Sequence, residues 1–456
     1  MTIINNALSG AVAAQAALNA ASQNVANLQT KGYTRQGVLL AAVAPGIGTK
    51  QAGNGVEVAG LLRISDSYKT QQLWRANSEL GRYSTQQPYL TQLEQVMGDS
   101  KSSLSYSVDK FFQALNAVGE EPTSAPLRGQ VVAQAGALAE SFNSIYQVTR
   151  NQQLSVQQQR EAILPKFSTL TANIASLNQR ITAAGATGTN VSALIDERDQ
   201  AIDSLADLAA IEVLEQPDGS RAVSLKSGQP LVVGNQAATL GIDTTSGTPK
   251  MQVTFARSVY GVDDAAIGGQ LGGLGAFEKN ILKPLQDSIV SMADQLATKI
   301  NTQLAAGKDG AGNAGKPMFD ISSTGATGIL SLAAGYTADD LALSSDGTPG
   351  DSGNLQLLVD IKNQTITLPS VGSVIIGDAD TQMVGKLGID SQQNKSLLNT
   401  ATTIRRQAED DWAATSGVNR DEEAMNLVEF QNMYQANMKV VAVANSLFDA
   451  TLSMFG

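Results

Sequence analysis

Apolar side chains recur every seven residues near both ends of the chain. The C-terminal series is Leu427, Tyr434, Val441, Phe448 and Phe455. The N-terminal series is Ile4, Ala11, Leu18 and Val25. A seven-residue period lines up one face of a helix and suits a coiled-coil seam. We therefore predict a long helix at each end, each with one apolar stripe that needs a partner.

The boundaries of these two helices follow from local signals. Asp421, Glu422 and Glu423 fit a first helical turn, where carboxylates complement the positive end of the helix dipole. From there the sequence runs without Gly or Pro to Gly456. In the N-terminal helix many seam positions are Ala, so a neighbour can approach closely, and Gly32 is the expected C-cap.

Between the two ends, helical spacing dominates residues 66–208 and returns from residue 382. Pro165 is expected to kink or break one of these helices. Residues 36–64 have a β-like, Gly-rich pattern. Further short strands are predicted at 211–214, 221–225, 231–233 and 251–255, with a helix at 277–304.

These patterns predict a mainly α protein with a β-rich inserted domain, an α+β multidomain fold. Its 456 residues suffice for about three domains. Paired terminal coiled-coil helices take residues 1–35 and 424–456. An elongated antiparallel helical bundle with a β-like extended segment takes 36–208 and 345–423. A small β-rich outer domain with one helix takes 209–344.

Composition narrows the function. The net charge of −11 argues against a nucleic-acid partner, because phosphate binding needs a Lys/Arg surface. The chain has no histidine and no cysteine, which removes the commonest general base and the preferred zinc ligands. No segment has the unbroken apolar length of a membrane span. Residues 1–30 carry no charge and lack the basic start of a cleavable signal peptide.

Four stretches could suggest a chemical site, and each has a simpler interpretation. Residues 196–199 and 409–411 are acidic, but both fit solvated helix faces. Residues 268–273 are Gly-rich without the Gly-Lys-Ser/Thr ending of a phosphate loop, which favours a flexible connection into a helix. Residues 309–313 lack the ligand pattern of a calcium loop and fit a turn. We predict no catalytic residue, no cofactor and no metal, and hence no enzyme.

The terminal stripes leave two interpretations open. The two ends could pack on the bundle as ordinary core helices. Alternatively they form an assembly surface that stays disordered until partners arrive, because a charge-poor helix with a narrow seam buries little apolar area alone. The residues expected at such an interface are Ile4, Leu8, Leu18, Val25, Leu28, Leu427, Phe430, Tyr434, Met438, Val441, Phe448 and Leu452.

Motifs at both ends resemble those of bacterial flagellar axial proteins. Ala7-Leu-Ser-Gly10, Asn24-Val-Ala-Asn27 and Thr30-Lys-Gly-Tyr-Thr-Arg35 are similar to their N-terminal signature. Ser416-Gly-Val-Asn-Arg-Asp-Glu-Glu423 and Tyr434-Gln-Ala-Asn437 resemble the C-terminal motif of the FlgK family of hook-associated proteins. Interior stretches at 190–199 and 269–274 are similar to the same family.

The resemblance implies a structural subunit at the hook–filament junction, in a ring of about eleven copies. It implies that the terminal helices form an inner tube, with the bundle and the β domain outside it. Implied partners are further copies, the hook protein, the second hook-associated junction protein and a cytoplasmic chaperone at the C-terminal segment. Export would use the flagellar type III system, to a location outside the cell.

Two alternatives remain at this stage. The chain could be another flagellar axial protein, such as the hook protein or the second junction protein. It could also be a secreted enzyme carried on a flagellar scaffold. The Ser-Gly-Val-Asn-x-Asp-Glu-Glu motif favours the junction protein, and the missing His and Cys argue against the enzyme.

Overall fold

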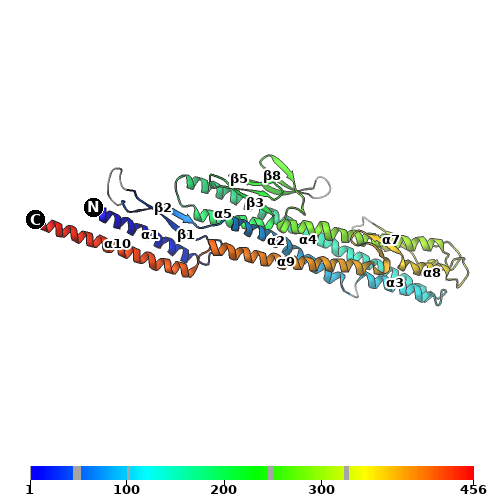
Figure 1. Cartoon of the computed structure of the whole chain (residues 1–456). Coiled ribbons are helices and arrows are strands. Elements are labelled where there is room, and N and C mark those ends of the chain that lie inside the picture. The colour runs from blue at the N-terminus through cyan, green and yellow to red at the C-terminus, as the bar shows by residue number, and fades with distance from the viewer. Residues whose placement is uncertain (1, 45–52, 100–102, 245–249, 323–327, 456) are drawn as a thin grey trace. The chain divides into compact units, whose positions relative to one another are not determined.

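The computed structural model of the chain describes residues 2–44, 53–99, 103–244, 250–322 and 328–455 (Figure 1). Helices predominate. They are α1 (Thr2–Ala26), α2 (Ser67–Met97), α3 (Leu104–Val118), α4 (Ala125–Ala186), α5 (Ser192–Leu208), α6 (Gly269–Phe277), α7 (Lys283–Ala306), α8 (Gly353–Asp360), α9 (Ala379–Ser416) and α10 (Arg420–Phe455). The expected fold class, mainly α with a β-rich insert, is confirmed.

All strand pairings in the described residues are antiparallel. The strands are β1 (Gln36–Ala42), β2 (Val56–Arg63), β3 (Ile211–Glu215), β4 (Arg221–Leu225), β5 (Pro230–Val233), β6 (Gln236–Ala237), β7 (Thr239–Asp243), β8 (Lys250–Phe255), β9 (Ser258–Gly261), β10 (Phe319–Ile321), β11 (Leu330–Leu332), β12 (Thr365–Leu368) and β13 (Gly372–Ile375). The sheets are β1-β2, β3-β4-β5-β6, β7-β8-β9, β10-β11 and β12-β13. The predicted strands at 211–255 are therefore present.

The chain divides into two compact units. Unit 1 holds residues 1–80, 165–261 and 401–456, and unit 2 holds 81–164 and 262–400. Helices α2, α4 and α9 each supply residues to both units. The division into inner helices, bundle and outer β domain stays a prediction.

Unit 1 has its core where helices and the small sheets meet. Phe167 on α4 and Ile202 on α5 are fully buried, as is Val232 on β5. The Thr171 hydroxyl donates to the Ala238 carbonyl at 2.8 Å, and the Asn178 amide donates to the carbonyls of Arg221 and Gly234 at 2.9 and 3.0 Å. These polar bonds fix the sheets against α4.

Unit 2 has an aromatic core. Phe111 on α3 packs edge-on against Phe112 and Phe319, with ring centroids 5.4 and 6.1 Å away. Tyr89 on α2 stacks with Phe277 at the end of α6, with centroids 5.4 Å apart. Such aromatic pairs add to the stabilisation from buried area alone.

Three sequence predictions about helices were wrong in detail. The N-terminal helix ends at Ala26, six residues before the expected cap at Gly32. A hydrogen bond from the Tyr33 amide to the Thr30 carbonyl instead closes a turn in which Gly32 adopts φ +77°. Pro165 does not break its helix, because α4 continues through it, whereas a kink at this residue stays a prediction.

The Gly-rich run is the third case. Residues 269–277 form the buried helix α6, which continues through a π-helical turn, Glu278–Leu282, into α7. A Cβ on Gly273 would lie 2.4 Å from the Arg82 carbonyl oxygen, and one on Gly275 would lie 2.4 Å from the Asp264 backbone. These glycines permit close packing, which a flexible connection does not need.

Candidate assembly surface

Helices α1 and α10 lie side by side and run in opposite directions (Figure 1). The two helices pack tightly at Gly10, where a Cβ would lie 2.6 Å from the Asn437 side-chain oxygen. Buried alanines on α1 line this contact, among them Ala7, Ala14 and Ala21. Small residues let the two backbones come close. The prediction that the C-terminal stripe has the N-terminal helix as its partner within the chain is confirmed.

The structure separates the twelve expected interface residues into two groups. Half-buried positions are Ile4, Leu18, Leu427, Phe430, Tyr434 and Val441. Exposed positions are Leu8, Val25, Leu28, Met438, Phe448 and Leu452. Since Gly10 faces Asn437 and the helices are antiparallel, Phe448 and Leu452 lie beyond the first residue of α1. The side chain of Phe455 lies outside the described part. Whether these residues join other subunits stays a prediction.

Helix α10 carries a second apolar stripe that the seven-residue series does not include. Its members are all exposed, and they are Met425, Val428, Met433, Val440, Val443, Leu447 and Met454. Eighteen residues make five helical turns, so Met425 and Val443 share one face, and Val428 and Leu447 lie close to it. That face points away from the α1 seam. We call these seven residues the outer stripe. The sequence did contain a signal for this stripe: Val440, Val443 and Leu447 are spaced by three and four residues, the spacing of one helix face.

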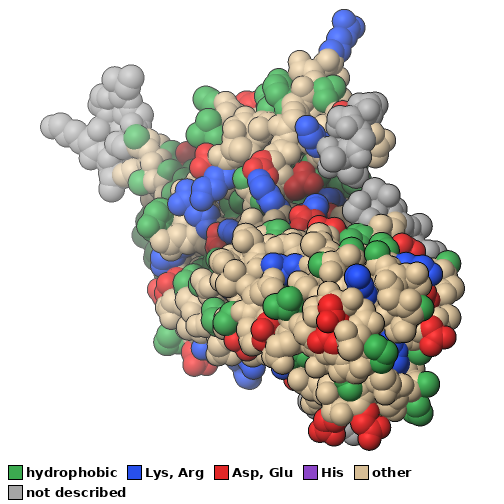
Figure 2. Space-filling model, turned by 90° about the vertical axis from the view of Figure 1, so that its right-hand side faces the viewer, with side chains coloured by type: hydrophobic (Ala, Val, Ile, Leu, Met, Phe, Trp, Pro, Cys, Tyr) green, Lys and Arg blue, Asp and Glu red, His purple; other side chains and the backbone are tan. Residues whose placement is uncertain are grey.

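The outer stripe differs from the exposed apolar residues near α3 and α8. Figure 2 looks at the chain from the end where α3 and α8 lie in Figure 1, and there hydrophobic side chains are scattered among polar ones. Scattered exposed apolar residues are ordinary, whereas large apolar residues gathered on one exposed face favour an interaction surface. The outer stripe of α10 faces solvent, and whether this helix serves as an ordinary core helix or as an assembly surface stays a prediction.

The hairpin β1-β2 is fastened to α1 by side chains of the helix. Asn24 is buried and donates to the Gln36 carbonyl at 2.9 Å, while its own oxygen accepts from the Gln36 amide at 3.0 Å. Ser9 accepts from the Val56 amide at 3.1 Å. Leu39, Leu61 and Leu62 on the hairpin are exposed. The hairpin thus extends the apolar surface beside α1.

A short joint separates α9 from α10. The Asn419 side chain accepts from the amides of Asp421 and Glu422 at 3.0 and 3.4 Å, so it caps α10. The three acidic residues occupy the first turn, as predicted. Arg35 fixes the joint, since its amide donates to the Ser416 carbonyl at 2.8 Å and its guanidinium pairs with Glu422 at 2.5 Å.

A buried ionic cluster ties the segment after α1 to α5. Asp196 accepts from the Thr34 amide at 3.1 Å and from Arg63 at 2.9 Å. Asp199 pairs with Arg63 at 3.0 Å and also with Arg221. Burial raises the pKa of Asp196, although Arg63 opposes that effect.

The prediction of a solvated face at residues 196–199 was therefore wrong for most of that stretch. Asp196 and Arg198 are buried, and only Glu197 is well exposed. Burial and the neighbouring Arg221 lower the pKa of Arg198 to about 10. The reason is long-range: Arg63 and Arg221 come from distant strands and neutralise the carboxylates. Residues 409–411 do follow the prediction, since Glu409 is exposed and pairs with Arg405.

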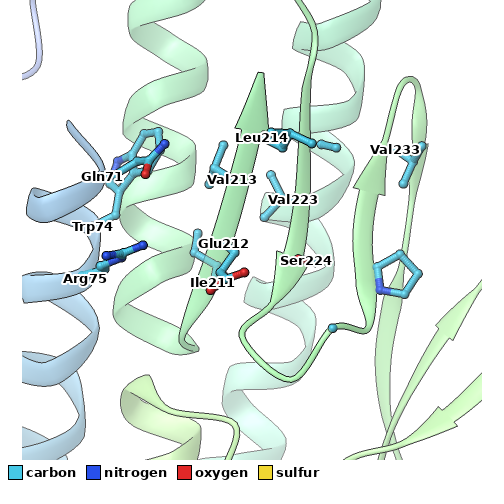
Figure 3. Close-up of a pocket in the computed structure, with 13 residues that line it drawn as sticks. Gln71, Trp74, Arg75, Ile211, Glu212, Val213, Leu214, Val223, Ser224 and Val233 are labelled. Atoms are coloured by element: carbon cyan, nitrogen blue, oxygen red, sulfur yellow. The ribbon is translucent and has the colours of Figure 1, made fainter. Parts of the chain in front are cut away.

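Unit 1 also contains a groove of about 520 Å³ between α2 and the β3-β4-β5 sheet. Figure 3 shows Trp74 and Gln71 on α2 on one side, with Val213 on β3 and Val223 on β4 on the other. Its lining is mainly apolar, and its charged members are Arg75 and Glu212.

A second hollow, of about 630 Å³, lies in unit 2 near Asp309. Hydrogen bonds from Lys316 and Thr337 lower the pKa of Asp340 to about 2. Bonds from Ser345 and Ser344 likewise hold the pKa of Asp351 well below its usual range. These carboxylates serve as turn acceptors. The predicted turn at residues 309–313 is present, with the Asp309 amide bonded to the Asn313 carbonyl at 2.9 Å.

Within the described residues, no group of three or more His, Cys, Asp and Glu side chains is placed to hold a metal ion. Over the same residues, no helix is both long and apolar enough to cross a membrane. Among the described residues, the pair of terminal helices is the best candidate for a functional surface.

Comparisons with known proteins relate both the middle and the C-terminal part of the chain to flagellar proteins. Residues 90–319, half of the chain, match the model of the flagellar hook-associated protein FlgK helical domain. Residues 413–454, which include most of α10, match the model of the flagellar basal body rod FlgEFG protein C-terminal region.

Whole-chain relatives point the same way. Flagellar hook-associated protein 1 of Escherichia coli (strain K12) is 27% identical, over 99% of this chain and 100% of that protein. The protein of the same name from Bacillus subtilis (strain 168) is 25% identical, over 97% and 96%.

Among solved structures, the flagellar hook junction protein FlgK from Burkholderia pseudomallei matches with a TM-score of 0.51 and 27% identity. That match covers 55% of this chain and 47% of the other. The relatives are structural flagellar proteins, so the prediction of a non-enzymatic structural protein is confirmed. The chain belongs to the FlgK family of flagellar hook-associated proteins.

Proposed function

We propose that α1 and α10 form the surface through which this axial junction protein joins its neighbours at the hook–filament junction. The observation that carries the proposal is the outer stripe of α10. It leaves large apolar side chains exposed on the side opposite α1, and Val428, Val443 and Leu447 are each about 60% exposed. Burying such a side chain fully contributes about 1.5–3 kcal/mol.

The two faces of α10 have different tasks in this proposal. Its seam, with Phe430, Tyr434 and Val441, holds α1 within the chain. The outer stripe contacts a neighbouring copy. Further residues complete the interface. Phe448 and Leu452 lie beyond the first residue of α1, and the others are Ile4, Leu8, Leu18, Val25, Leu28, Leu427 and Met438. Burial of several such residues around one axis favours a closed ring, of about eleven copies by family resemblance.

The axial neighbours follow from the family. We place the hook protein on one side of the ring and the second hook-associated junction protein on the other, outside the cell. The terminal helices line the inner tube, with the helical bundle and the β domain outside it. The chain reaches this place through the flagellar type III export system.

The outer stripe also supports a chaperone for the subunit before export. Large apolar residues gathered on one exposed face promote aggregation in a free protein. A cytoplasmic chaperone that covers the C-terminal segment removes this hazard.

A pair of matched substitutions tests the proposal. Leu447 on α10 is 61% exposed, and Leu357 on α8 in unit 2 is 52% exposed. We expect Leu447→Glu to abolish filament attachment in cells that lack the native protein. Leu357→Glu, the same change at a similar exposure outside the terminal helices, is expected to support normal filaments. Circular dichroism and gel filtration check that both variants fold as monomers.

Normal filaments with Leu447→Glu would reject the outer stripe as an interface. A truncation that removes residues 427–456 provides an independent check, since it removes both faces of α10. It is expected to leave a soluble folded core that does not join the hook.

A further inference from the structure

The methionines of this chain fall into two groups that differ sharply in exposure. Those on α10 are between 41% and 83% exposed, and they are Met425, Met433, Met438 and Met454. The remaining methionines with described side chains are at most 2% exposed, and they are Met97, Met251, Met292, Met318 and Met383. The exposed thioethers are thus concentrated on one helix.

We propose that the α10 methionines are an oxidation site of the unassembled subunit, with hydroperoxides as the reagent. The sulfur lone pair attacks one oxygen of the peroxide, the O–O bond breaks and an S–O bond forms. The sulfur loses two electrons, which the peroxide gains as it leaves as water, or as an alcohol from an organic hydroperoxide. The product is methionine sulfoxide, and its formation requires access of the peroxide to sulfur.

The position of these sulfurs gives the modification a consequence. Met425, Met433 and Met454 belong to the outer stripe, and Met438 flanks the seam with α1. A sulfoxide is polar, so burying it in an apolar contact without a hydrogen-bond partner is unfavourable. Oxidised subunits therefore join poorly, and incorporation selects reduced subunits. The modification rests on exposure alone, whereas this consequence rests on the proposed function.

Assembly changes the access of peroxide to these methionines. Once the outer stripe is covered by a neighbour, its sulfurs lose access to peroxide. The same methionines are then oxidisable before incorporation and protected after it. Sulfoxide reductases of both stereochemical classes return the side chain to methionine, so the free subunit can be restored.

The first arm of the test measures the modification. The full-length monomer is treated with hydrogen peroxide, quenched at intervals and digested for mass spectrometry. We expect the four α10 methionines to oxidise at least about tenfold faster than the five buried ones. Equal rates in the two groups, or unmodified α10 methionines, would overturn the site.

The second arm measures the consequence, with each protein compared with its own untreated sample. Peroxide is expected to lower the joining of the native chain to hook preparations about tenfold. The variant Met425→Leu/Met433→Leu/Met438→Leu/Met454→Leu carries no exposed sulfur on α10, so its treated and untreated samples should join equally. Treatment with sulfoxide reductases should restore the native chain.

The outcomes separate the two proposals. If native and variant proteins lose joining equally, or neither loses it, the exposed α10 sulfurs are not the cause and the consequence is wrong. If Leu447→Glu also joins normally, the proposed interface itself fails, while the oxidation pattern of the monomer still stands or falls on the first arm.

Discussion

Phe111 and Phe448 have the same side chain and opposite surroundings. Phe111 on α3 is fully buried between Phe112 and Phe319, whereas Phe448 on α10 is 59% exposed. Both lie on well-formed helices with apolar stripes. The stripe of α3 is covered within unit 2, and the outer stripe of α10 has no cover among the described residues of unit 1. The same pattern therefore serves stability in one region and association in the other.

The largest effect expected from this comparison is the difference in stability between two separate variants, one without the Phe111 ring and one without the Phe448 ring. Phe111→Ala should lower the free energy of unfolding by about 3–5 kcal/mol, because it removes buried contacts and leaves a cavity. Phe448→Ala should change it by less than about 0.5 kcal/mol, as for most surface substitutions. Urea unfolding of the monomer measures both. Similar losses would mean that α10 is a core helix of the free subunit.

The ionic cluster is a second buried region for this comparison, because it holds Arg63 of β2 against α5. Asp199→Ala leaves Arg63 and Arg221 without a shared carboxylate. We expect a loss of about 2–3 kcal/mol in the free energy of unfolding, less than for fully buried pairs because these side chains keep some solvent contact. Glu197→Ala, an exposed change on the same helix, is the control and should be nearly neutral. An equal loss in both variants would contradict the buried cluster.

A substitution at Gly10 tests the tight packing between α1 and α10, and its expected effect is the next in size. Gly10→Val places a branched side chain against Asn437 and should weaken the pairing by about 1–2 kcal/mol. Asn437→Ala removes the clashing atoms, so the double variant should recover most of this loss. Amide exchange across α1 reports the pairing. No recovery in the double variant would mean that Gly10 matters for another reason.

The smallest effect concerns pH and lies in unit 2. Burial raises the pKa of Asp380, whose oxygen accepts from the Ser105 amide at 2.8 Å. A raised folded pKa gives stability that is fully present below the unfolded value and lost as pH rises through the folded value.

Asp380→Asn keeps the acceptor and removes the charge. The variant should therefore be more stable than the native chain at neutral pH, and the difference should shrink as pH falls toward 4. Unfolding midpoints across this range measure it, with Asp378→Asn as a control for loss of an exposed charge. A difference that grows on acidification would contradict the assigned direction.

Much of the fold follows from the sequence because helical spacing is a local signal. The long helices, the strands at 211–255 and the pairing of the two ends were predicted from apolar periods and small seam residues. The outer stripe was missed because α10 is apolar on two faces. Periodicity shows that a face is apolar, but the position of α1 decides which face stays exposed.

Long-range partners account for the other errors. Asp196 pairs with Arg63 across 133 positions of the chain, so its own neighbours give no sign of burial. Gly273 and Gly275 look permissive in isolation. Their role is set by the Arg82 and Asp264 backbones, which no local pattern places beside them.

The contact between Gly10 and Asn437 also has a consequence for the order of events during synthesis. A ribosome makes α1 before α10, and a long stretch of the chain lies between the two helices. Until α10 is made, α1 has no helical partner from its own chain, and the paired surface does not exist. A polypeptide interrupted before α10 cannot present that surface to a growing structure. Pairing the two ends thus restricts assembly to chains in which translation has passed both helices.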